Sequence, residues 1–280
     1  MGATAHGSGR TVVFQAWVGR RPPAFVERCL ASTAGWARSR GFEYRLLGDD
    51  FLDVLPEWYR ERLGSHIVQQ TNLARMRYAR DVLAAGADRA IWIDADVVVY
   101  APDDLVLDAP DGFALCREAW IQPAHEHHAC IYGVNQSVVV ADRGNPLLDY
   151  LVWAHETLVR DRPQNVRPFG TATALLAAVH EATPLPLVTG IAMMNPTMLR
   201  EIASGEGGPV TREYVRRHGY PTQAANLTLS MLGTTYDGGS ASEDDYDAAV
   251  EVLLATRGAP LDLARAYAPA APSAQSRGTR

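Results

Sequence analysis

Two aspartates, Asp94 and Asp96, stand in the middle of an apolar run that extends from residue 91 to residue 100. Side chains on a strand alternate between its two faces, so this spacing predicts that both carboxylates point the same way. Two such carboxylates at the end of a buried strand repel each other unless a cation lies between them. Mg²⁺ and Mn²⁺ take one or two carboxylates together with phosphate oxygens. The run therefore predicts an enzyme that holds Mn²⁺ or Mg²⁺ and a diphosphate.

A second group of titratable residues is the segment His125-Glu126-His127-His128. Its histidines do not have the His-Glu-X-X-His spacing of zinc proteases, and adjacent side chains on a loop point apart. The segment therefore indicates a surface or acceptor-site loop rather than a metal site. Because histidine titrates near neutral pH, one of these residues could act as an acid or base. Glu126 and His127 are the predicted bases if the reaction inverts the configuration of its substrate.

The composition excludes several classes of enzyme. The chain has 280 residues, and its 26 residues of the Lys and Arg types are all arginines. Nucleotide enzymes of the Walker type, kinases and pyridoxal enzymes all need a lysine, so these classes are excluded. The net charge of -6 argues against a nucleic-acid binder. The three cysteines have no paired spacing, which argues against a disulfide framework or a zinc site.

Neither a membrane-spanning apolar run nor a signal-peptide pattern is present in the sequence. We therefore expect a cytoplasmic protein without a transmembrane segment. The absence of lysine, together with many alanines, glycines and prolines, is typical of a GC-rich bacterial genome.

The hydrophobic patterns predict alternating strands and helices between a disordered arm, residues 1–10, and a disordered tail, residues 268–280. This alternation indicates an α/β fold with a layered sheet. Residues 240–247 are acidic and are expected to be mobile. The predicted strands cover residues 11–17, 42–47, 89–94, 113–116 and 136–140. The predicted helices cover residues 22–40, 58–63, 68–85, 147–159 and 171–180.

The order of these features resembles the GT-A-fold glycosyltransferases. Trp17 in the first strand, Asn72-Leu73-Ala74-Arg75 on a helix and Ile93-Asp94-Ala95-Asp96-Val97 carry the resemblance. It is nearest to family 32, the sugar-binding Asp-X-Asp group. The resemblance implies a single α/β/α sandwich over residues 11–267 with a mostly parallel central sheet, its nucleotide half at 11–105 and its acceptor half at 106–267. It also implies a hexosyltransferase that moves a sugar from a nucleotide-diphosphate donor to a small-molecule or glycan acceptor. UDP is the expected nucleotide of the donor.

The resemblance also implies roles for the carboxylates. Asp96 would bind the metal that bridges the two phosphates, and Asp94 would contact the ribose or share the metal. A third metal ligand is expected late in the chain, and His218 and Asn226 are its candidates. Trp17 lies where relatives carry an aromatic ring near the nucleotide base, although a core tryptophan is the alternative.

Further polar residues match positions that contact the donor in such enzymes. Asn72 and Arg75 correspond to a pair that reaches the donor sugar and its phosphates, with Arg77 as the alternative arginine. A planar guanidinium suits phosphate oxygens. Asn135 and Gln136 enter a predicted strand that the resemblance places beside the donor sugar. They are expected to contact the sugar or the acceptor, because an amide can both donate to and accept from hydroxyls. An ordinary turn is the other interpretation of Asn135.

Three other functions remain open on the sequence. A sugar nucleotidyltransferase has a similar sheet but needs a glycine-rich basic loop after its first strand, and residues 19–23 are basic without that run of glycines. An aspartate-nucleophile phosphatase also uses two aspartates, but carries them on its first strand. A non-catalytic relative that binds only glycans or nucleotides would be expected to lose the aspartate pair.

Overall fold

The computed structural model describes residues 9–122, 129–161 and 171–267. The predicted arm and tail lie outside these ranges except for Gly9 and Arg10. The main-chain nitrogen of Arg10 donates to Asp88 Oδ2 at 2.8 Å, and its guanidinium pairs with Glu43 at 2.8 Å. The chain is therefore attached to the sheet from Arg10 onward. None of the described helices combines the length and the apolar character that a membrane crossing requires.

The central sheet of the described residues has the strand order β2-β1-β3-β6-β5-β7. Three of its five pairings, β1 with β2, β1 with β3 and β5 with β7, are parallel, and β6 is antiparallel to both neighbours. Helices flank this sheet, which confirms the predicted fold class, a single α/β domain with a mostly parallel central sheet. The strands are β1 (Thr11–Ala16), β2 (Glu43–Leu47), β3 (Arg89–Ile93), β5 (Phe113–Gln122), β6 (Ala129–Asp142) and β7 (Leu187–Val188).

A second, smaller sheet corrects one prediction from the sequence. The apolar run around the two aspartates is not continuous, because β3 ends at Ile93 and Val97 to Val99 form β4 in the other sheet. A turn separates them, closed by the Val97 nitrogen donating to the Asp94 carbonyl at 3.1 Å. Asp94 and Asp96 therefore do not share one strand face. The smaller sheet has the order β4-β9-β8, with β8 (Ile191–Met193) and β9 (Ala224–Asn226).

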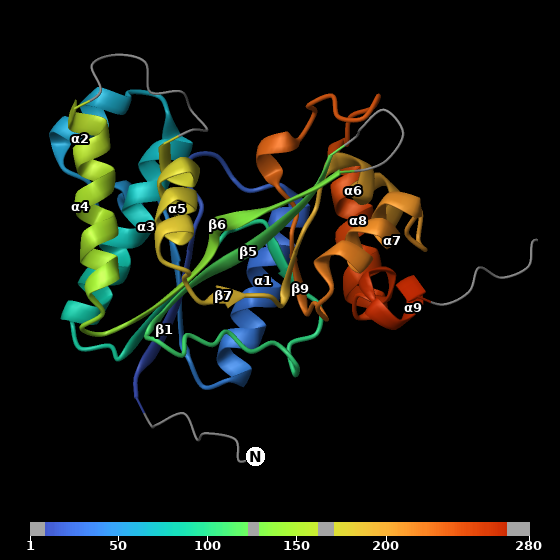
Figure 1. Cartoon of the computed structure of the whole chain (residues 1–280), viewed down its shortest axis with the longest axis horizontal. Helices are drawn as coiled ribbons and strands as arrows, with labels where there is room; N and C mark the ends of the chain where they lie inside the picture. Colours follow the sequence, from blue (N-terminus) through green and yellow to red (C-terminus); the bar gives the residue numbers. More distant parts are fainter. Residues whose placement is uncertain (1–8, 123–128, 162–170, 268–280) are drawn as a thin grey trace, which may run out of the picture.

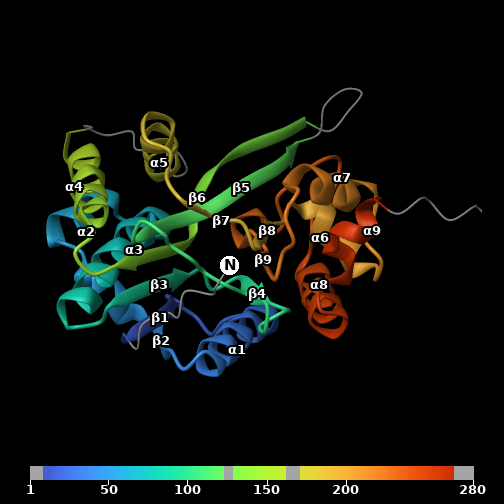
Figure 2. The ribbon, with the colours of Figure 1, turned by 60° about the horizontal axis from the view of Figure 1, so that its bottom comes forward.

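The helices gather on two sides of the central sheet. Figure 1 shows α2 to α5 on one side and α6 to α9 on the other, and Figure 2 shows the same separation after rotation. The α-helices are α1 (Ala24–Ser39), α2 (Glu57–Leu63), α3 (Ile67–Ala84), α4 (Pro146–Asp161), α5 (Thr171–Ala182), α6 (Pro196–Ala203), α7 (Pro209–His218), α8 (Glu243–Thr256) and α9 (Leu263–Tyr267). The short 3₁₀ helices are η1 (Asp49–Val54), η2 (Leu229–Met231) and η3 (Ala259–Leu261).

Apolar cores on both faces of the sheet hold these layers and fix the edge that carries the aspartates. On one face Phe14 and Trp92 pack with Leu73 and Met76 of α3, whose apolar residues recur at helical spacing. On the other side, α1, α6, α7 and α8 share a second core that includes Phe25. Burial on both sides makes the strand ends rigid supports for polar side chains.

Helix α8 is a second correction, because its first residues fall in the acidic stretch that was expected to be mobile. Ser242 caps the helix: its hydroxyl accepts from the Asp245 nitrogen at 3.2 Å, and Asp245 Oδ2 accepts from the Ser242 nitrogen at 2.8 Å. Acidic residues in the first turn also suit the positive end of a helix. The acidic residues are therefore a helix start.

Candidate functional site

A pocket of about 480 Å³ opens at the carboxyl ends of β1 and β3. These strands are parallel, so the residues that follow them meet at one edge of the sheet. In α/β proteins, ligands bind in the crevice outside the carboxyl ends of the strands. Most of the predicted site residues line this pocket: Trp17, Asn72, Arg75, Asp94, Asp96, Asn135, Gln136 and Asn226.

Asp94 is held in place by two donors. Its Oδ1 accepts from Arg75 Nη1 at 2.9 Å and from Trp92 Nε1 at 2.7 Å, whereas its Oδ2 accepts no hydrogen bond from the described residues. The side chain of Arg75 is only 7% exposed, and Nη1 also donates to the Gln136 carbonyl at 2.6 Å. The guanidinium lies over the Trp92 ring at 4.8 Å. Two hydrogen bonds to Oδ1 therefore orient the Asp94 carboxylate, and Oδ2 remains available to a ligand.

Asp96 is the more buried carboxylate, at 9% exposure. Its Oδ2 accepts from the Leu229 nitrogen at 2.7 Å, and its carbonyl accepts from the Leu227 nitrogen at 3.0 Å. Burial, and then the neighbouring charge of Asp94, raise the pKa of Asp96 to about 6. A carboxylate in this condition is stabilised by a cation that approaches from the pocket.

The charges and donor types of the pocket fit a divalent metal. Among the described residues that line it, Arg75 opposes two aspartates, so the ionised site has an excess negative charge. In the described ranges, no group of three or more His, Cys, Asp or Glu side chains is arranged to hold a metal. Mg²⁺ and Mn²⁺ do not need such a cage, because phosphate oxygens and water complete their coordination. The residues present therefore fit a divalent metal held by Asp96 and Asp94.

The amides on β6 supply further polar groups. Gln136 is 7% exposed, and its Oε1 is buried without a hydrogen-bond partner in the described structure. An unpartnered buried acceptor costs the folded protein about 1–3 kcal/mol. Asn135 Oδ1 accepts from the Ser137 nitrogen at 2.9 Å, and its Nδ2 contacts Met193 Sδ at 3.3 Å. These contacts fix the Asn135 amide at the pocket wall.

Apolar side chains form another part of the pocket wall. Trp17 lies there half-buried, with Nε1 donating to the Arg20 carbonyl at 2.5 Å, so the ring is anchored at one edge. Ile67 and Val68, at the start of α3, are both more than 40% exposed and line the same pocket. An anchored ring beside exposed apolar side chains suits a flat heterocycle.

His218, one of the two predicted third ligands, lies elsewhere. It ends α7, where Arg117 Nη1 approaches its Nδ1 at 3.1 Å and its Nε2 meets the Thr189 carbonyl at 2.8 Å. Since a guanidinium only donates, Nδ1 accepts and Nε2 carries the proton. Burial lowers the pKa of His218 to about 4. Both ring nitrogens are used, and the residue does not line the pocket, whereas Asn226 does.

The structure places the alternative arginine outside the pocket and does not describe the two predicted bases. Arg77 donates to the Val54 carbonyl and pairs with Glu156, so Arg75 is the arginine of the pocket. Glu126 and His127 lie outside the described residues.

Two donors in this site, the Trp92 side chain and the Leu229 main chain, were not predicted from the sequence. The position of Trp92 two residues before Asp94 was a usable signal, because it places the ring on the same side of the strand as the carboxylate. The Leu229 nitrogen is brought in from a distant segment and gave no signal in the sequence.

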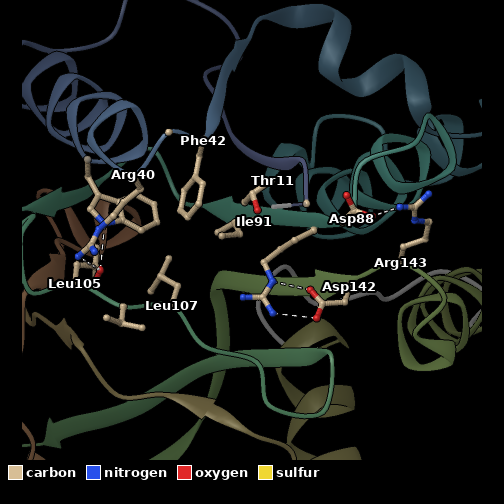
Figure 3. Close-up of a pocket in the computed structure, with 14 residues that line it drawn as sticks. Thr11, Arg40, Phe42, Asp88, Ile91, Leu105, Leu107, Asp142 and Arg143 are labelled. Atoms are coloured by element: carbon tan, nitrogen blue, oxygen red, sulfur yellow. Dashed lines mark hydrogen bonds and ion pairs between the residues drawn. The ribbon is translucent and has the colours of Figure 1, made fainter. Parts of the chain in front are cut away.

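A second cavity of about 780 Å³ opens at the amino ends of the same strands (Figure 3). Its charged side chains are used internally: Arg89 pairs with Asp142 at 2.6 Å, and Arg143 pairs with Asp88. Arg40 donates to main-chain carbonyls, including that of Leu105 at 3.0 Å. It is larger than the aspartate pocket, but each charged side chain in its lining already has a partner within the protein, so the aspartate pocket is the better candidate site.

Comparison with known proteins gives no family assignment. No protein-family model matches the chain, and no curated protein matches it. Among solved structures, it is similar to a glycosyltransferase involved in glycosylation of the major capsid of PBCV-1, with 11% identity and a TM-score of 0.46 over 85% of this chain and 98% of that one. It is also similar to the apo form of glycosyltransferase GlyE of Streptococcus pneumoniae TIGR4, with 13% identity, a TM-score of 0.43 and coverage of 89% and 63%. The bifunctional glycosyltransferase WbbM, in its apo structure, gives 8% identity, a TM-score of 0.44 and coverage of 91% and 53%.

Proposed function

We propose that this chain is a metal-dependent glycosyltransferase that moves a sugar from a nucleotide-diphosphate donor, with UDP as the expected nucleotide, to an acceptor. One observation carries the proposal: Asp94 and Asp96 line a pocket at the carboxyl ends of β1 and β3, with Arg75 as the cationic side chain among its described lining residues. That excess of negative charge makes a metal diphosphate a better ligand than a free anion.

The donor half of the pocket positions the nucleotide. The anchored ring of Trp17 provides a face for the base. Asp96 and Asp94 would hold Mn²⁺ or Mg²⁺ together with the diphosphate. Such a metal supplies Lewis-acid stabilisation of the charge that develops on the departing diphosphate. Arg75 orients Asp94 through the 2.9 Å contact and adds positive charge next to the phosphates.

The amide half of the pocket contacts the sugar. Asn72, Asn135 and Gln136 line this part of the pocket, and their side-chain amides would bond the sugar hydroxyls. Bonds of this kind fix the anomeric carbon relative to the leaving diphosphate, and catalysis follows from this positioning together with stabilisation of charge. Glu126 and His127 remain the predicted bases for an inverting reaction.

A panel of nucleotide sugars, scored for slow hydrolysis with Mn²⁺, with Mg²⁺ and with EDTA, tests this function without knowledge of the acceptor. We expect one donor to be hydrolysed with metal and to be stable with EDTA. Hydrolysis that is the same with EDTA, or the absence of hydrolysis across the panel, would contradict the proposal.

A further inference from the structure

The β5–β6 hairpin continues one wall of the pocket outward. Figures 1 and 2 both show it extending beyond the rest of the central sheet. Cys116 pairs with Asn135, which lines the pocket, and Glu118 pairs with Gly133 one step farther out. Residues two apart on a strand share a face, and the register is regular from Cys116 to Gln122. Glu118 and Trp120 therefore lie on the same hairpin face as Asn135.

Glu118 on this face has no hydrogen bond or ion pair with any described residue. It is largely buried, and burial raises the pKa of its carboxyl. Gly133 lies opposite, and a Cβ built there would be 3.5 Å from Glu118 Oε2, so the carboxylate lies across the neighbouring strand. A largely buried carboxylate without a partner is costly for the folded protein alone. A hydroxyl-bearing ligand would remove that cost.

Trp120 lies two residues beyond Glu118 on β5. A second segment of the chain also leads from the pocket to this side chain. Leu229 and Ser230 line the pocket, and the chain then continues to Tyr236. The Tyr236 ring meets Trp120 edge-on, with centroids 5.8 Å apart, and its hydroxyl donates to the Ile121 carbonyl. Tyr236 thereby fixes the position of the partly exposed indole. Two separate segments therefore connect the pocket to the surface that carries Trp120.

We propose that this hairpin face, formed by Glu118 and Trp120, binds the acceptor and that the acceptor is a carbohydrate. The inference rests on the proposed function. A sugar ring presents a flat C–H face to an aromatic ring and hydroxyl donors to a carboxylate, which are the two groups found here. The negative charge of Glu118 disfavours a phosphorylated acceptor. Arg117, the neighbouring cation, projects to the opposite face, where it contacts His218 and the Tyr132 ring.

Saturation-transfer NMR with a panel of neutral methyl glycosides, in the presence of UDP and Mn²⁺, tests this inference. We expect at least one glycoside to bind the wild type, and to bind about tenfold more weakly to Trp120→Ala and Glu118→Gln. Trp120→Phe should recover most of the affinity because it keeps an aromatic face. Tyr132→Ala is the matched control, since it removes an exposed ring from the other face of the same hairpin and should leave glycoside binding unchanged.

The outcomes separate this inference from the proposed function. Melting curves first establish that each variant folds. A wild type that binds none of the glycosides, or equal binding by wild type and Trp120→Ala, overturns the carbohydrate site on the hairpin. If UDP fails to bind the wild type with Mn²⁺, the proposed donor site is overturned instead. Glycoside binding that still depends on Trp120 would then support a carbohydrate site on the hairpin without a donor site.

Discussion

At the scale of single residues, the buried Arg75–Asp94 pair fixes the position of one carboxylate in the pocket. Burial lowers the pKa of Arg75, so its charge is tolerated only because Asp94 faces it. Asp94 is more exposed, at 25%, and presents its second oxygen without a described partner. Asp96, without an arginine bonded to it, is left as the carboxylate that most needs a cation. This division of roles supports the proposed metal site, with Asp96 as its main ligand and an oriented Asp94 beside it.

Replacement of Arg75 by methionine should destabilise the fold, because it leaves Asp94 facing an apolar side chain. A fully buried pair that loses one partner costs about 3–5 kcal/mol, and the partial exposure of Asp94 reduces this to roughly 1–3 kcal/mol. Urea unfolding measures the change. The control is Arg257→Met, which removes an exposed pair with Asp103 and should cost less than about 0.5 kcal/mol. Equal losses for the two variants would show that the buried pair has no special role.

His218 should make stability depend on pH. Its native pKa of about 4 lies below the unfolded value of 6.5, so the unfolded chain binds the proton first. Its contribution is complete above pH 6.5 and is lost as the pH falls toward 4, by up to about 3 kcal/mol. Unfolding free energies at pH 7 and pH 5 should therefore differ less in His218→Asn than in the wild type. The same difference in both proteins would refute this assignment.

At the scale of elements, hydrophobic periodicity predicted the parts of the fold that periodicity determines. Strands β1 and β3 and helix α3 form where the sequence predicts them, because buried strands and amphipathic helices have distinct apolar patterns. The turn at Asp94 to Asp96 could not be predicted, because Val97 to Val99 continue the same apolar run in a different sheet. The carboxylates still meet in one pocket, although for a different geometric reason.

Elements built from few residues could not be predicted from the sequence either. Strands β8 and β9 have three residues each, and their pairing depends on contacts between distant segments. The position of His218 similarly depends on Arg117, about a hundred residues earlier in the chain. The short distance from Leu229 to Asp96 is another such long-range contact.

The junction after α8 gives a test at this scale. Gly258 has φ of +78°, and a Cβ there would lie 2.2 Å from Cε2 of Tyr100, just beyond β4. Gly258→Ala should cost the strain of a left-handed residue, about 1–2 kcal/mol, plus roughly 1–3 kcal/mol of overpacking. Gly41→Ala, with φ of +73° and no atom within 4 Å of the added Cβ, should cost only the first part. Thermal or urea unfolding would compare them, and equal losses would exclude the clash with Tyr100.

At the scale of the whole molecule, the pocket joins the early and late parts of the chain. Trp17, Arg75 and Asp94 come from the first part, and Asn135 and Asn226 from the second. A ligand in this pocket contacts both parts, so its binding energy adds to the stability of the whole domain. The predicted division into a nucleotide half and an acceptor half is consistent with this arrangement and remains a prediction.

Binding should therefore raise the melting temperature only when metal and nucleotide are both present. UDP at about 100 times its dissociation constant would add roughly 2.7 kcal/mol of stability. Differential scanning fluorimetry with UDP and Mn²⁺, with UDP and EDTA, and with Mn²⁺ alone measures the effect. The same shift with UDP and EDTA would contradict a metal-bridged diphosphate.

Calorimetric titration of UDP into the wild type and into Asp96→Asn, with and without Mn²⁺, tests the central claim most directly. Asp104→Asn, at an exposed position outside the pocket, is the matched control for the loss of one carboxylate. We predict that UDP binds the wild type and Asp104→Asn only with Mn²⁺, and that Asp96→Asn loses this binding while its melting curve shows a folded protein. Unchanged binding heats in Asp96→Asn, or equal binding by the wild type with and without Mn²⁺, would contradict a metal held by Asp96 on a nucleotide diphosphate.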